Sequence, residues 1–127
     1  MTNSNESMAG QIGQAATTFQ QQRTGHKPRS VHVLLSGDTL VVTLHGALSR
    51  VEQIMSQSSD GAAKVQEFHR QLFLNSSDTL KNEIRRITGM DVREATAELD
   101  PKTGEVYNDF RKDQLLSKQH QRQRYAD

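Results

Sequence analysis

The run over residues 31–44 constrains the fold of this chain more than any other segment. Two stretches rich in β-branched residues, VHVLLS and TLVVTLH, flank the turn dipeptide Gly37-Asp38, which is typical of a tight antiparallel hairpin. A two-residue loop predicts these cross-strand pairs: Ser36 with Thr39, Leu35 with Leu40, Val33 with Val42, and Val31 with Leu44. The opposite face then carries a mixed set of side chains: His32, Leu34, Val41, Thr43 and His45. We therefore expect one face in the core and the other partly in water.

Helical spacing of apolar residues predicts a helix on each side of this hairpin. Before the hairpin, and after a polar start over residues 1–7, one amphipathic stripe is formed by Met8, Ile12, Ala15, Ala16 and Phe19. Gly25 and Pro28 end that helix. After the hairpin, Ser49 and Glu52 have the form of a capping box, which predicts a short helix to about Met55.

A longer helix is predicted over residues 61–88, with Gly89 as its C-terminal stop. Its expected core stripe consists of Val65, Phe68, Leu72, Leu80, Ile84 and Ile87. The segment Asn75-Ser76-Ser77-Asp78 favours caps over helix interiors, so a continuous helix and a break at this point both stay open.

A second hairpin is predicted from residues 91–99 and 105–110, joined by the turn Asp100 to Gly104. The chain is thus an α+β protein of order α-β-β-α-α-β-β-α. It has a four-stranded antiparallel sheet, a long helix across one face, and N- and C-terminal helices. We divide it into an N-terminal helix with its polar start (1–24), an α+β core domain (25–111) and a basic polar tail or helix (112–127).

Composition excludes several classes of function. The 127 residues contain no cysteine, so disulfides, thiolate metal sites and cysteine nucleophiles are excluded. With 16 Lys+Arg against 15 Asp+Glu, the formal charge of +1 argues against a general nucleic-acid or anionic-membrane binder. The first thirty residues have no apolar run typical of a signal peptide, and the chain has no membrane-spanning run, so we expect a cytoplasmic protein.

Side chains with catalytic potential are sparse. His32 and His45 are expected diagonally across the first hairpin, but no third ligand or carboxylate stands at a spacing that completes a metal or general-base site. We interpret them as surface or interface histidines, and His69 as a half-exposed helix residue. No nucleophile elbow or phosphate-binding loop occurs. We therefore expect no enzyme, no cofactor and no metal.

The C-terminal tail is basic, although the net charge of the whole chain is close to zero. Its bases are Arg111, Lys112, Lys118, Arg122 and Arg124, against Asp113 alone. A nucleic-acid- or nucleotide-binding domain that uses this tail is the alternative function, although the tail lacks the aromatic residues that single-strand binders use for stacking.

The ordered pieces between Gly25 and Phe110 resemble a small family: the soluble component of a bacterial sodium-translocating, membrane-potential-generating system. The matching residues are Gly25, Pro28, Asp38 to Val42, Gly46 to Ser49, Glu52, Arg70, Leu72, Leu80, Ile84, Thr88, Gly89, Asp100, Thr103, Gly104 and Phe110. The family has a Gly-Arg-Gly-Pro-like turn where this chain reads Gly25-His26-Lys27-Pro28. The resemblance implies a cytoplasmic accessory protein of a membrane system linked to sodium, membrane potential and bicarbonate supply, without a catalytic residue.

The first functional hypothesis is therefore a non-enzymatic interaction protein, expected as a homodimer, that serves a membrane transport complex from the cytoplasmic side. The candidate interaction residues are Gly25, Pro28, Arg70, Asp100, Thr103, Gly104, Leu34 and Val41. We expect the apolar stripe of the N-terminal helix to cover the mixed face at Leu34 and Val41, within one chain or across a dimer.

Overall fold

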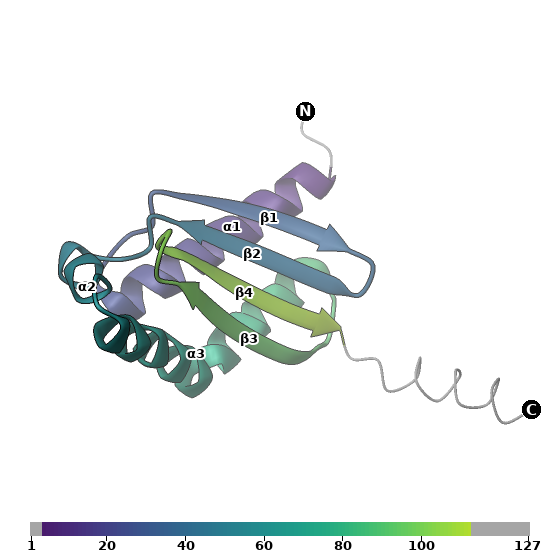
Figure 1. The fold of residues 1–127 in the computed structure, drawn as a ribbon. Coiled ribbons are helices and arrows are strands. Elements are labelled where there is room, and N and C mark those ends of the chain that lie inside the picture. Colours follow the sequence, from purple (N-terminus) through teal and green to yellow (C-terminus); the bar gives the residue numbers. More distant parts are fainter. Residues whose placement is uncertain (1–3, 113–127) are drawn as a thin grey trace, which may run out of the picture.

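The computed structural model describes residues 4–112, which form an α+β fold in two layers (Figure 1). The elements in chain order are α1 (Ser4–Thr24), β1 (Ser30–Ser36), β2 (Thr39–His45), α2 (Arg50–Met55), α3 (Ser59–Thr88), β3 (Val92–Asp100) and β4 (Glu105–Lys112). The predicted fold class and the order of these elements are confirmed. The expected C-terminal helix lies outside the described residues.

The sheet is antiparallel with the strand order β1-β2-β4-β3, so the two hairpins join through β2 and β4. Both long helices lie on the same side of it: α1 packs against β1 and β2, and α3 packs against β3 (Figure 1). The other side of the sheet, which we call the open face, is covered by no described element.

The first hairpin has the predicted register, from Ser36 opposite Thr39 to Val31 opposite Leu44. Its two strands differ in burial, however. The β2 residues on the core face are fully buried, whereas Val31 and Val33 are half-buried and Leu35 is 52% exposed. The reason is position: β1 is an edge strand, so the helices shield it less well than they shield β2.

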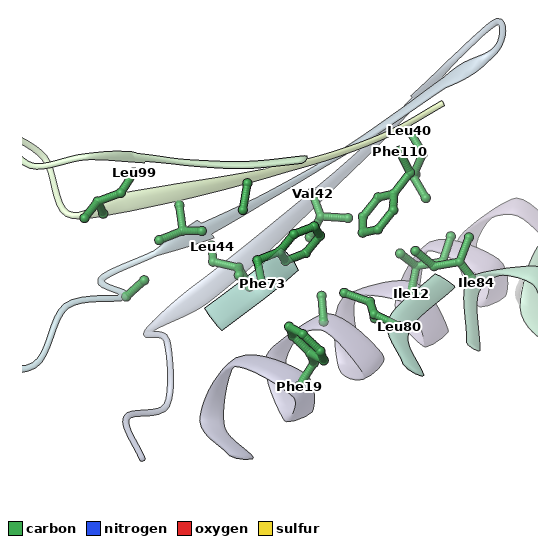
Figure 2. Packing of buried hydrophobic residues seen from close by; sticks show 14 of the residues in the cluster. Ile12, Phe19, Leu40, Val42, Leu44, Phe73, Leu80, Ile84, Leu99 and Phe110 are labelled. Atoms are coloured by element: carbon green, nitrogen blue, oxygen red, sulfur yellow. The ribbon is translucent and has the colours of Figure 1, made fainter. Parts of the chain in front are cut away.

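The hydrophobic core fills the space between the sheet and the two long helices. Leu40, Val42 and Phe110 project from the sheet toward the helices in Figure 2. Phe73 on α3 connects the layers, with ring centroids 5.9 Å from Phe19 and 6.1 Å from Phe110. Burying an aromatic or aliphatic side chain of this size contributes roughly 1.5–3 kcal/mol, so these contacts are the main stabilisation of the fold.

Helix α1 lies on the core side of the sheet, so the prediction that it covers Leu34 and Val41 within one chain is wrong; coverage across a dimer stays a prediction. Ile12 and Phe19 belong to the same buried cluster as the sheet residues. A Cβ placed on Gly13 would stand 3.1 Å from a methyl carbon of Val31, which marks how closely α1 approaches β1. The helix takes this side because the core face of β2 offers the larger apolar surface.

Helix α3 is continuous from Ser59 to Thr88, so the interpretation with a break at Asn75 to Asp78 is wrong. The serines are accommodated locally: the Ser76 hydroxyl donates to the Leu72 carbonyl at 2.6 Å, and Ser77 is buried. As predicted, Gly89 ends the helix in the left-handed region, at φ +76°.

The buried stripe of α3 differs from the predicted one in the first half of the helix. Its members are Val65, His69, Phe73, Ser77, Leu80 and Ile84. Phe68 is 50% exposed and His69 is buried, which reverses both predictions. Sequence periodicity favoured the aromatic residue at this turn, but the helix is rotated so that His69 meets polar partners from α1 and α2.

Those partners form a buried polar network. Glu52 Oε2 lies 2.6 Å from His69 Nε2, and Gln20 Nε2 lies 3.3 Å from His69 Nδ1. The backbone N–H of Ser49 donates to Glu52 Oε1, which completes the predicted capping box. Burial raises the pKa of Glu52, but the hydrogen bonds from His69 and Ser49 and the proximity of His69 outweigh it, and the pKa falls from 4.5 to about 2. His69 on α3 therefore ties the three helices together, through Gln20 on α1 and Glu52 on α2.

Candidate functional site: the open sheet face

The open face has an apolar part on the first hairpin. Leu34 and Val41 stand directly opposite each other on β1 and β2, as predicted. Leu34 is 63% exposed and Val41 is half-buried, whereas the neighbouring Leu35 projects toward the core side, opposite Leu40. An apolar pair on an uncovered sheet face is typical of an interaction site.

The other half of the open face is acidic. Buried residues alternate with exposed ones along β3 and β4, which places Glu94, Glu98, Glu105 and Asp109 on this side. Arg111 also lies on this side of β4. The face therefore combines an apolar half on β1 and β2 with a mainly negative half on β3 and β4.

Across these two halves, four polar side chains form one hydrogen-bonded chain, the His-Glu-Tyr chain: His32 on β1, His45 on β2, and Glu105 and Tyr107 on β4. His32 Nδ1 lies 2.7 Å from His45 Nε2, and His45 Nδ1 lies 2.6 Å from Glu105 Oε2. The Tyr107 hydroxyl donates to Glu105 Oε1 at 2.8 Å. This hydrogen bond is the main reason that the pKa of Glu105 is lowered and that of Tyr107 raised.

Sequence reasoning placed His32 and His45 on one face but missed Glu105 and Tyr107. The alternation of β4 was visible in the sequence, yet the contact depends on the pairing of β2 with β4, which are some sixty residues apart in the chain. A carboxylate thus completes the histidine pair, contrary to the expectation that none was available.

The predicted turn and tip meet at one end of the sheet. Gly25 ends α1 at φ +79°, and Pro28 is buried in the loop that follows. His26 Nε2 lies 3.0 Å from the Gly46 carbonyl, and the Ala47 N–H donates to the Gly104 carbonyl at 3.0 Å. Residues 46–47 therefore connect the loop after α1 to the tip of the second hairpin.

Within that tip, each polar residue has a structural role. The Lys102 N–H donates to Asp100 Oδ1 at 2.9 Å, and the Glu105 N–H donates to the Thr103 hydroxyl at 3.3 Å. Gly104 adopts φ +76° and packs against Leu48. A pocket of about 560 Å³ lies beside the tip, lined in part by Arg29, Lys102 and Thr103.

Arg70 lies apart from both the tip and the apolar half. Its guanidinium makes ion pairs with Glu67 at 2.7 Å and with Glu98 at 3.5 Å, which joins α3 to β3. The structure thus brings Leu34 and Val41 together on the open face, gathers the turn and the tip at the sheet end, and leaves Arg70 at the α3–β3 edge.

None of the helices between residues 4 and 112 contains an apolar stretch that would cross a bilayer. Over the same residues, no set of three or more histidine, aspartate or glutamate side chains is placed to hold a metal ion.

Fold and surface together define a small two-layer α+β domain whose sheet is covered on one side only. The chain belongs to the MpsC family, described as the Na⁺-translocating membrane potential-generating system (MpsC), whose model matches residues 4–111. The resemblance noted from the sequence is thereby confirmed. An uncharacterized protein of Bacillus subtilis (strain 168), YbcI, is 27% identical over 105 residues, which are 83% of this chain and 85% of that protein. No solved structure matches the chain significantly.

Proposed function

We propose that this protein is a non-enzymatic accessory component of a sodium-linked membrane system and that it docks from the cytoplasmic side through its open face. The observation that carries the proposal is the uncovered sheet surface around Leu34 and Val41 in a chain of the MpsC family. The link to bicarbonate supply that the resemblance implies belongs to the same proposal.

The apolar half of the face supplies the driving force for docking. Leu34 is 63% exposed, and covering the rest of a side chain of this size contributes on the order of 1 kcal/mol. The half-buried Val41, directly opposite Leu34, extends the surface that a partner would remove from water.

The acidic half of the open face supplies charge complementarity to a basic partner. Cytoplasmic loops of membrane proteins carry an excess of Lys and Arg. A face with Glu94 and Asp109 beside an apolar patch suits such a loop, and opposite charges speed the encounter and set its orientation.

Co-purification from detergent-solubilised membranes tests the proposal. The double variant Leu34→Lys, Val41→Lys introduces charge into the apolar half. The matched control is Leu74→Lys on α3, where the native leucine is also exposed, at 53%, but belongs to the helical layer. We expect the native protein and the control to co-purify with the membrane-spanning components of the sodium-translocating system, and the double variant to lose at least tenfold in yield. Equal recovery of all three proteins would refute docking through this face.

Self-association is part of the same proposal. β1 is an edge strand with exposed Leu34 and Leu35, and edge strands of this kind pair readily with a second copy. We propose a homodimer that uses this edge.

A further inference from the structure

The His-Glu-Tyr chain determines which ring nitrogens carry hydrogen. Because the Glu105 carboxylate is an acceptor, His45 Nδ1 is the donor in their 2.6 Å contact. In a neutral His45 the lone pair then resides on Nε2, and that atom faces His32 Nδ1 at 2.7 Å. In metal-binding histidines, one ring nitrogen donates its hydrogen to a carboxylate and the other presents its lone pair to the ion. His45 has this arrangement, with its free lone pair directed at His32.

The separation of the two nitrogens is short enough for both to bind one ion. Two ligands about 2.0 Å from an ion stand about 2.8 Å apart when the angle between the bonds is 90°, and about 3.3 Å apart in a tetrahedral site. The observed 2.7 Å is close to the 90° value. The two rings are nearly perpendicular, with an interplanar angle of 89° and centroids 4.7 Å apart. Modest rotation of both rings on the open face would aim their lone pairs at one ion.

The surroundings of the pair favour a cation. Glu105 lies behind His45, and Asp100 stands opposite Glu105 in the β3–β4 register. The hydroxyl of Tyr107 fixes the second oxygen of Glu105. His32 is exposed on the edge strand, so the remaining coordination positions of an ion face solvent.

We propose that His32 Nδ1 and His45 Nε2 form a two-ligand site for a divalent transition ion of the copper or nickel class, with Glu105 as the positioning residue. Water completes the coordination, since the described chain offers no set of three such ligands. On binding, the hydrogen on His32 Nδ1 moves through solvent to Nε2 of the same ring. The site stands independently of docking to a membrane partner.

Calorimetric titration of untagged, chelator-treated full-length protein with NiCl₂, CuSO₄ and ZnCl₂ tests this site. We expect one ion per chain and the tightest binding for Cu²⁺, because the intrinsic affinity order of divalent ions for nitrogen ligands favours it over Ni²⁺ and Zn²⁺. His32→Gln and His45→Gln should each weaken Ni²⁺ binding at least tenfold. Glu105→Gln, which removes the orienting carboxylate, should weaken it about 10–100-fold.

His26→Gln is the matched control, because its Nε2 contacts the Gly46 carbonyl at the sheet end and takes no part in the pair. It should bind Ni²⁺ like the native protein, and urea unfolding without metal should verify that each variant folds. Paramagnetic Cu²⁺ should broaden the ring NMR signals of His32 and His45 first. Unchanged affinity in His32→Gln, or equal loss in His26→Gln, would overturn the assignment, as would first broadening at another histidine.

Discussion

The substitution Glu52→Gln tests how the buried network holds the three helices together. Glutamine keeps the shape of the side chain and an oxygen that accepts from the Ser49 N–H, so the capping contact survives while the negative charge facing His69 is removed. We expect the variant to fold with a lower free energy of unfolding at pH 7.

The magnitude follows from the pKa of Glu52, which falls from 4.5 to about 2 on folding. Each factor of ten in a proton equilibrium is worth about 1.4 kcal/mol, so the charged carboxylate contributes about 2–3 kcal/mol once partial screening by water is allowed for. Because the folded state lowers this pKa, the contribution is complete above about pH 4.5. It is lost as the pH falls toward 2.

Urea unfolding of the native protein and Glu52→Gln at a series of pH values between 7 and 2.5 measures this contribution. The difference between the two should be about 2–3 kcal/mol at pH 7 and should shrink steadily below pH 4.5. The matched control, Glu83→Gln, removes the exposed partner of Arg86 and should leave the unfolding free energy nearly unchanged. A difference for Glu52→Gln that stays constant down to pH 2.5 would refute the reasoning.

Three further outcomes follow from the structure. A Cβ on Gly61 would stand 1.9 Å from the Met55 carbonyl oxygen, so Gly61→Ala should lower the unfolding free energy by about 1–3 kcal/mol in urea titrations. Gly10 has open space around it, so Gly10→Ala should raise the unfolding free energy by about 0.5–1 kcal/mol. Asn108 is fully buried and its side-chain atoms have no hydrogen-bond partner. Asn108→Leu should therefore raise the urea midpoint by the equivalent of about 1–3 kcal/mol, and a lower midpoint would show that the fold needs the amide. Light scattering should give twice the 14.3 kDa chain mass for the native protein and the single mass for Leu35→Lys, and a native monomer would contradict the proposed dimer.

Local signals predicted most of the secondary structure. The turn Gly37-Asp38 was sufficient for the register of the first hairpin, because a two-residue loop leaves one pairing that keeps alternate apolar residues on one face. The sequence also predicted the capping box of Ser49 and Glu52 and the helix stop at Gly89, because helix ends depend on a few neighbouring residues.

What the sequence did not reveal depends on contacts between distant segments. Phe68 and His69 are adjacent in the chain, and only the positions of Gln20 and Glu52 explain why the histidine is the buried one. In the same way, the contact between Glu105 and His45 exists because β4 pairs with β2, and the sequence does not reveal that pairing. Periodicity ranks residues by hydrophobicity, so it cannot detect a polar side chain that is buried because partners from other elements satisfy it.

Photo-crosslinking in intact cells tests most directly the central claim that the open face docks on the membrane system. A photoreactive phenylalanine analogue at position 34 reports on the open face, and one at position 74 reports on the helical layer. Docking through the open face predicts a covalent adduct with a membrane-spanning component of the sodium-translocating system from position 34 and none from position 74. An adduct from position 74 alone, or no membrane adduct from position 34, would contradict it.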